Sequence, residues 1–302
     1  QLLRAGRRPE ELDAAQLRTV QSLIERELAA GALGVSLGLG YAPDCFYSTE
    51  TLIEALRPLQ DSGIPITVHM RQEGSGVVGA LQEMIMVARA LRTPVEISHL
   101  KSIGKANWRS CTPEMLRLMA EARQEGVRIA CDVYPYTAGS TQLVHVLPPE
   151  TQQGGMEALT EHLADPAFRE TLKARMLTGS DFENISLLAG FENIVVSSVR
   201  LDGLRQYEGQ SIVQIAEQQG KDPFTCLFDL LQAAHCDVTM IDFIAAEDDI
   251  CDILRDAHSC VISDSTYPTT GMLHPRVYGT YTTLLEHFVR EKQVLSLEAA
   301  VH

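Results

Sequence analysis

The chain contains 302 residues, of which 45% are hydrophobic and 22% are charged, a composition that is typical of a folded globular protein and excludes a disordered one. Its formal net charge of −15 argues against nucleic-acid binding, because phosphate contacts need clustered Lys and Arg side chains. No segment approaches the run of about 18 apolar residues that a membrane-spanning helix needs, so the sequence predicts no membrane span.

The seven cysteines are an odd number and form no CxxC pair. This pattern argues against a disulfide framework and against a structural zinc knuckle. It is typical of thiols in a reducing compartment, so we expect a cytoplasmic protein.

Short apolar segments rich in β-branched residues recur roughly every thirty residues in the first half of the chain, which is typical of buried strands. They lie at residues 32–37, 64–69, 94–99 and 127–134, and a fifth lies at 259–264. Amphipathic helical patterns separate them, at residues 13–30, 49–59, 77–91 and 112–125. The first of these helices is expected to begin with a capping box formed by Asp13 and Gln16.

This alternation of strand and helix predicts an α/β protein with a parallel sheet. Two architectures fit it, a (β/α)8 barrel and an open doubly wound sheet. The absence of a GxGxxG or GxxxxGK[ST] motif after any of these strands weighs against the nucleotide-binding form of the open sheet.

The alternation stops after residue 136 and resumes only at 259–264. The intervening chain carries helical patterns and two apolar runs that could be strands; the helical patterns are 155–163, 165–177, 211–219 and 223–234, and the apolar runs are 193–198 and 238–244. We therefore expect residues 137–258 to contain an insertion that forms a lid or a substrate wall.

Residues capable of metal chemistry end several of the predicted strands. His69 and His99 end neighbouring strands, and Asp264 ends the last one. Because parallel strands end at the same edge of a sheet, the two histidines should lie within metal-ligand distance of each other. A single histidine in such a place more often has a structural role, but the matched pair favours a metal site, where a carboxylate could accept a proton from a bound water.

The segments around these residues resemble the D-aminoacylase, or N-acyl-D-amino-acid deacylase, branch of the amidohydrolase superfamily. In chain order they are GALGVSLGL at 31–39, TVHMR at 67–71, ISHLK at 97–101, DVYPY at 132–136, GST at 139–141, SD at 263–264 and HPR at 274–276. The resemblance implies a (β/α)8 TIM barrel that uses one or two zinc ions to hydrolyse N-acyl-D-amino acids to a D-amino acid and a carboxylate. It implies zinc ligands at His69 and His99 and a general acid/base at Asp264. It also implies contacts with the small-molecule substrate from Lys101, Tyr134, Ser140 and Arg276.

The chain departs from the family pattern, since it has no HxH pair and no cysteine at the place of the family's cysteine ligand. By motif order its strands would be the fourth to eighth of the barrel, with the insertion between the seventh and eighth. We therefore expect residues 1–302 to form an incomplete barrel, with the first three strands before residue 1 and the family's β-sandwich also absent. We further expect weak metal retention, and pairing of copies through exposed sheet edges.

Two other functions stay open at this point. One is a non-catalytic barrel fragment or binding module that retains the family residues. The other is an amidohydrolase that acts on cyclic amides, similar to dihydroorotase or hydantoinase. An acidic substrate side chain would need an additional cation in the pocket, for which Arg71, Lys105 and Arg109 are candidates.

Overall fold

The computed structural model describes residues 12–268 and 270–302. A five-stranded parallel sheet forms its first half, with the strand order β1-β2-β3-β4-β8. The strands are β1 (Val35–Gly38), β2 (Ile66–His69), β3 (Val95–Ile97), β4 (Ile129–Val133) and β8 (Ser259–Val261). Each neighbouring pair is parallel. The predicted α/β class and its five strands are therefore confirmed, and β1 and β8 form the two edges of this sheet in the described chain.

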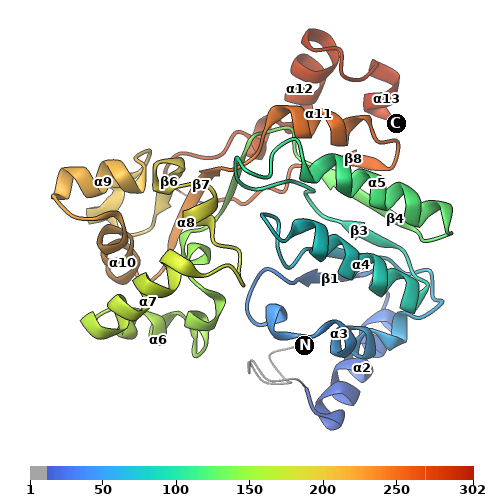
Figure 1. Cartoon of the computed structure of the whole chain (residues 1–302), viewed down its shortest axis with the longest axis horizontal. Helices are drawn as coiled ribbons and strands as arrows, with labels where there is room; N and C mark the ends of the chain where they lie inside the picture. The colour runs from blue at the N-terminus through green and yellow to red at the C-terminus, as the bar shows by residue number, and fades with distance from the viewer. Residues whose placement is uncertain (1–11, 269) are drawn as a thin grey trace.

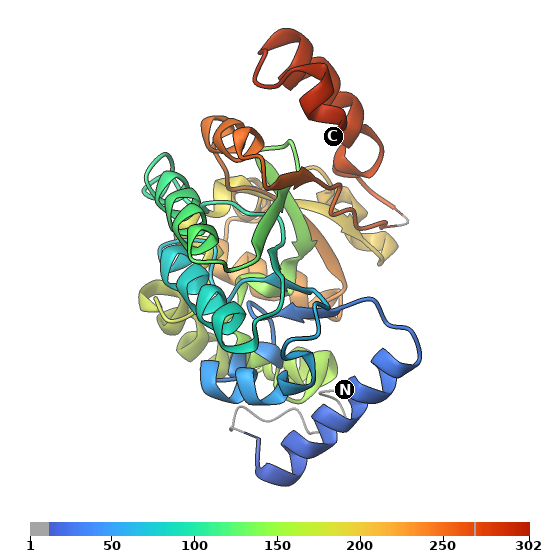
Figure 2. The same cartoon turned by 90° about the vertical axis from the view of Figure 1, so that its right-hand side faces the viewer.

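The helices that connect these strands are amphipathic and cover the sheet. They are α2 (Ala14–Ala29), α3 (Thr49–Ala55), α4 (Val77–Leu91), α5 (Cys111–Gln124) and α11 (Glu247–Arg255). The capping box of Asp13 and Gln16 is present at the start of α2. The second helix ends at Ala55 rather than at residue 59, because Pro58 cannot continue the α-helical hydrogen bonding and the chain continues as a 3-10 turn. Figures 1 and 2 show α4 and α5 side by side along the sheet.

The sheet and these helices share one apolar core. The strands contribute Ile66, Val68 and Ile97, and α4 and α5 contribute buried side chains such as Leu81 and Met115. Residues of α11 belong to the same core, so α11 packs with the parallel sheet although it directly follows the second lobe in the chain. A rigid layered core of this kind fixes where the strand ends lie.

The chain between β4 and α11 forms a second lobe with its own core, on the left in Figure 1. Its antiparallel sheet has the order β5-β7-β6, from β5 (Ala138–Gln142), β6 (Ile194–Val199) and β7 (Val238–Phe243). Its helices are α6 (Gly155–His162), α7 (Pro166–Thr178), α8 (Ile185–Leu188), α9 (Ile212–Gln219) and α10 (Pro223–Ala233). The four helical patterns and two apolar runs of the sequence correspond to elements here, whereas β5 was not predicted because Gly139, Ser140 and Thr141 are small or polar.

The last segment contains α12 (Arg276–Thr283), a π-helix at Leu284–Glu291 and α13 (Leu297–Val301). Short 3-10 turns lie at Asp44–Phe46, Arg57–Leu59, Leu143–Val146, Pro149–Gln152, Phe191–Asn193 and Asp202–Tyr207. Among the described residues, no helix combines the length and apolar character needed to cross a lipid bilayer.

Candidate metal centre and pocket

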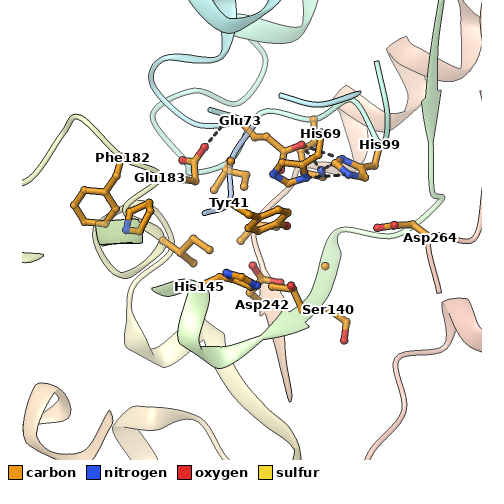
Figure 3. Close-up of a pocket in the computed structure, with 18 of the residues that line it drawn as sticks. Tyr41, His69, Glu73, His99, Ser140, His145, Phe182, Glu183, Asp242 and Asp264 are labelled. Carbon is orange, nitrogen blue, oxygen red and sulfur yellow. Dashed lines mark hydrogen bonds and ion pairs between the residues drawn. The ribbon is translucent and has the colours of Figure 1, made fainter. Parts of the chain in front are cut away.

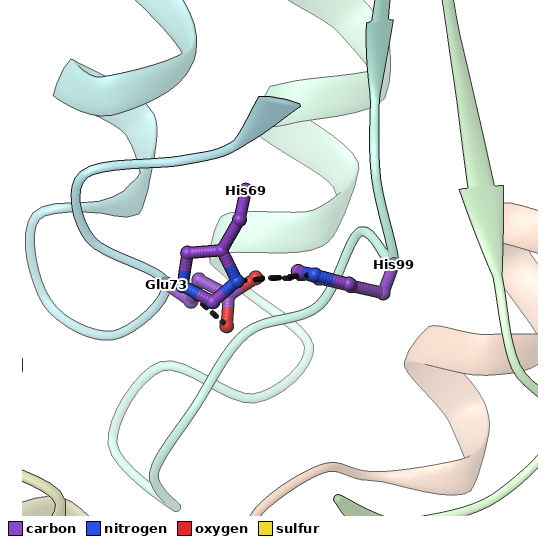
Figure 4. Close-up of side chains that lie close together, drawn as sticks. All are labelled: His69, Glu73 and His99. Atoms are coloured by element: carbon purple, nitrogen blue, oxygen red, sulfur yellow. Dashed lines mark hydrogen bonds and ion pairs between the residues drawn. The ribbon is translucent and has the colours of Figure 1, made fainter. Parts of the chain in front are cut away.

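His69 and His99 meet at the carboxyl edge of the parallel sheet. His69 is the last residue of β2, and His99 follows β3 by two residues. His69 Nδ1 lies 3.0 Å from His99 Nε2, and the ring centroids are 4.7 Å apart. The structure therefore brings the two predicted ligands together, as Figure 4 shows.

Glu73 is a third member of this cluster that the sequence analysis missed. One Glu73 oxygen lies 2.9 Å from His99 Nδ1 and the other lies 3.9 Å from His69 Nε2. One donor atom from each of the three residues can be chosen so that all lie within 4.8 Å of one another (Figure 4). Two histidines and one glutamate are a donor set found in catalytic zinc sites, so the residues present fit this metal.

His69 and Glu73 are in the protonation states that a metal requires. Desolvation lowers the pKa of His69 to about 3, so its imidazole is neutral at pH 7 and can offer a lone pair. Burial alone would raise the pKa of Glu73, but the Lys101 ammonium and the two histidines hold it well below its usual range. The carboxylate is therefore ionised and able to bind a cation.

Lys101 lies inside the cluster rather than only facing the pocket. Its Nζ donates a hydrogen bond of 2.7 Å to Glu73 and lies 2.7 Å from His99 Nδ1. The side chain is buried, at 8% exposure. Lys101 thus compensates the charge of Glu73 in this structure.

Asp132 orients the turn that carries His99. The backbone N–H of His99 donates to the Asp132 carboxylate, and His99 has a positive φ of 43°. This left-handed conformation is unfavourable for a residue with a Cβ, so the hydrogen bond helps to hold it. Burial, and then the neighbouring Glu96, raise the pKa of Asp132 to about 8.

Arg276 connects the segment after β8 to the second lobe. It donates to Asp264 Oδ2 at 2.9 Å and to the carbonyl oxygen of Ser140 at 2.8 Å. Its guanidinium carbon lies 4.9 Å from the centre of the Tyr134 ring. Asp264 is not part of the three-residue cluster, and Figure 3 shows its carboxylate directed toward the pocket from the side of the segment after β8.

All seven residues predicted for the site line one pocket: His69, His99, Lys101, Tyr134, Ser140, Asp264 and Arg276. The roles of these residues remain predictions, but their convergence from distant parts of the chain is a property of the fold. The second lobe supplies further lining residues that the sequence analysis did not identify, among them His145, Phe182, Glu183 and Asp242 (Figure 3).

Tyr41 and Gly40 also lie against the cluster. The Tyr41 ring centroid lies 4.4 Å from that of His69 and 4.4 Å from that of His145. A Cβ on Gly40 would lie 2.6 Å from His69 Nε2, so only glycine leaves room for this imidazole. The segment at residues 39–41, which follows β1, therefore shapes the metal centre, although it contains no histidine, cysteine or carboxylate that would have indicated this from the sequence.

Comparison with known proteins identifies relatives of the chain, although no family model matches it. A D-aminoacylase from Alcaligenes xylosoxydans xylosoxydans is 30% identical over 303 residues, covering 99% of this chain and 52% of the relative. An N-acyl-D-glutamate deacylase from the same organism is 27% identical, covering 95% of this chain and 49% of the relative.

A solved structure has the same fold over nearly the whole chain. It is the N-acyl-D-glutamate deacylase from Bordetella bronchiseptica, complexed with zinc and a phosphonate inhibitor that mimics the tetrahedral intermediate. The TM-score is 0.76 at 26% identity, covering 98% of this chain and 52% of that structure. The chain spans about half the length of the relatives it matches. In sequence and in fold, it is therefore a homologue of the D-aminoacylase and N-acyl-D-amino-acid deacylase amidohydrolases.

Proposed function

We propose that this chain takes part in the zinc-dependent hydrolysis of the amide bond of N-acyl-D-amino acids. The observation that carries the proposal is the cluster of His69, Glu73 and His99, which lies at one side of a pocket that Lys101 and Arg276 also line. The activities named for its relatives point to the same substrate class.

His69, His99 and Glu73 would hold the metal ion. When bound, zinc lowers the pKa of its water to about 7 and polarises a carbonyl oxygen, which is the chemistry that an unreactive amide needs. A bound zinc ion and the Lys101 ammonium would compete for the same Glu73 oxygen. Zinc binding would therefore leave the ammonium available to a substrate carboxylate.

Asp264 would move the proton. Its Oδ2 is held by Arg276, so Oδ1 is the atom that accepts a proton from the attacking water and returns it to the leaving nitrogen. The Asp264 side chain is 37% exposed, so the attacking water and the leaving nitrogen can both reach its carboxylate. Arg276 and Lys101 would bind the substrate carboxylate, and Tyr134 and Ser140 would line its position.

The remaining expectations of the sequence analysis belong to the same proposal. Residues 1–302 would form one part of a (β/α)8 barrel, and residues 137–258 would contain the insertion that covers the site. The cysteines of the described structure are free thiols, which is compatible with a cytoplasmic location. Light scattering on the purified chain would test whether two copies pair.

The test combines metal binding with a substrate panel. We expect the chain to bind about one zinc ion weakly, and His69→Ala to lose it, while His162→Ala at an exposed position of α6 binds zinc like the wild type. With zinc present, we expect hydrolysis of N-acetyl-D-amino acids but not of the L-enantiomers or of cyclic amides. Hydrolysis of cyclic amides alone would contradict the proposal, and zinc and ligand binding without turnover would indicate a binding module.

A further inference from the structure

Asp242 is a buried carboxylate in the pocket that the proposed reaction does not use. It lies on β7 of the second lobe, is 3% exposed and lines the pocket beside Ser140 and His145 (Figure 3). Among the described residues, its Oδ1 has no hydrogen-bond partner. A buried polar atom without a partner is costly, so such an atom in a pocket wall is available to accept a hydrogen bond from a bound molecule.

The neighbouring strand leaves room for this carboxylate. Gly139 on β5 pairs with Asp242 across the antiparallel sheet. A Cβ at position 139 would lie 2.8 Å from Asp242 Oδ1. Any residue other than glycine would therefore displace the carboxylate from its place in the wall. Burial raises the pKa of Asp242 to about 6, while Lys101 and Arg276 act in the opposite direction, so the group is largely ionised at pH 7.

Two positive side chains line the pocket in the described chain. Lys101 is paired with Glu73, and Arg276 is paired with Asp264 and with the carbonyl oxygen of Ser140, although its buried Nε has no partner among the described residues. Burial lowers the pKa of His145 to about 4, so its imidazole is neutral. The proposed reaction assigns both Lys101 and Arg276 to the α-carboxylate of the substrate, so the described lining offers no further cation to an acidic substrate side chain.

The three cations that could have met an acidic side chain lie elsewhere. Arg71 is paired with Glu83 at 2.9 Å, and Lys105 and Arg109 are exposed. None of them lines the pocket. Two of the relatives are named for acidic substrates, N-acyl-D-glutamate and N-acyl-D-aspartate, whose side-chain carboxylates would meet Asp242 rather than a cation here.

We propose that Asp242 determines the side-chain class of the substrate, accepting at Oδ1 a hydrogen bond from a donating side chain and repelling an acidic one. Cationic side chains such as that of D-lysine, and neutral donors such as that of D-glutamine, fit this site. The inference rests on the proposed hydrolysis of N-acyl-D-amino acids, and it specifies which of them the pocket takes.

The test compares substrates of similar length that differ in the side-chain end group. We would measure kcat/KM of the zinc-loaded chain for N-acetyl-D-lysine, N-acetyl-D-glutamine, N-acetyl-D-methionine and N-acetyl-D-glutamate. The chain should prefer the lysine and glutamine derivatives over the glutamate derivative by about a hundredfold, because repulsion at a buried site replaces an ion pair in the first case and a hydrogen bond to the carboxylate in the second.

Asp242→Asn should lower kcat/KM for the lysine derivative by about tenfold or more and change that for the methionine derivative by less than about threefold. Asp242→Ser serves as a second variant should the first fail to fold. Asp237→Asn is the matched control, because Asp237 precedes β7, pairs with Arg200 and lies outside the pocket. Asp237→Asn should leave kcat/KM for all four substrates unchanged.

The outcomes separate the inference from the proposal on which it rests. Equal effects of Asp242→Asn on all four substrates, or a wild-type preference for the glutamate derivative, would overturn the inference alone. If the wild-type chain neither hydrolyses these compounds nor binds them in a calorimetric titration, the proposed function fails and the inference fails with it.

Discussion

Glu183 and Glu73 lie 110 residues apart in the chain, yet the carboxylate of Glu183 accepts a hydrogen bond from the backbone N–H of Glu73. The same carboxylate accepts a second one from the N–H of Gly74 at 3.0 Å. A Cβ on Gly74 would lie 2.5 Å from the Leu188 side chain, so the second lobe packs directly against this loop. The position of the third ligand in the metal cluster therefore depends on the second lobe.

Replacing Glu183 should weaken zinc binding without a change in the ligands themselves. In Glu183→Ala, the loop that carries Glu73 loses both hydrogen bonds, and we expect the zinc Kd to rise by about 10- to 100-fold, the usual effect of removing a residue that orients a ligand. A titration against a competing chelator would measure this. Glu170→Ala, at an exposed position of α7, should bind zinc like the wild type. Identical Kd values for both variants would show that Glu183 does not position Glu73.

Gly40→Ala should weaken zinc binding through a steric clash with His69. The added methyl group would lie 2.6 Å from His69 Nε2, and the imidazole would have to rotate away from His99. We expect a zinc Kd at least about tenfold higher and a loss of about 1–3 kcal/mol in unfolding free energy. Gly79→Ala on α4 is the control, since its Cβ would meet no atom within 4 Å. That variant should be more stable by about 0.5–1 kcal/mol, because alanine favours a helix over glycine.

Lys101→Met should make zinc binding depend more steeply on pH. The Lys101 ammonium holds the pKa of the buried Glu73 below its usual range, and burial would raise that pKa once the ammonium is gone. At low pH the protonated Glu73 of the variant would bind zinc poorly, whereas at high pH zinc would bind without competition from Lys101. The ratio of Kd at pH 6 to Kd at pH 8.5 should therefore exceed the wild-type ratio. An unchanged ratio would contradict this role, and the exposed Lys105→Met provides the control.

The ionised Asp242 carboxylate should lower the free energy of unfolding at neutral pH. Its pKa is raised from 3.8 to about 6 in the folded chain, so folding favours the protonated form. The resulting stability is fully present below pH 3.8 and is lost as the pH rises through about 6. Asp242→Asn removes this penalty, and we expect it to be more stable than the wild type by about 2–3 kcal/mol at pH 7.5 but not at pH 3.5. Urea unfolding at the two pH values would test this, and an equal difference at both would refute it.

The sequence predicted the parallel sheet because its strands repeat at a regular spacing and carry β-branched residues. It also predicted that His69 and His99 meet, since parallel strands end at one edge. Those inferences depend on local composition and on the topology of βα units. They required no knowledge of the second lobe.

Glu73, Glu183 and Asp242 could not be found in this way. Glu73 lies in a loop with no periodic pattern, and one more glutamate carries little information in a chain with 40 acidic residues. Glu183 and Asp242 reach the pocket only through the fold of the second lobe, and β5 was missed because its residues are small or polar. Long-range packing decides these contacts, and hydrophobic periodicity does not report it.

β4 and β8 are neighbours in the parallel sheet although the whole second lobe separates them in the chain. The second lobe is thus an insertion in the connection between β4 and β8. Replacing this lobe with the corresponding segment of a relative would change all the pocket residues that it contributes in a single step. Such a chimera would inherit a new side-chain preference through the residue at position 242. Unless the donated piece also brought a carboxylate that reaches the backbone of Glu73, the chimera would bind zinc about 10- to 100-fold more weakly, so selectivity and metal affinity are inherited together.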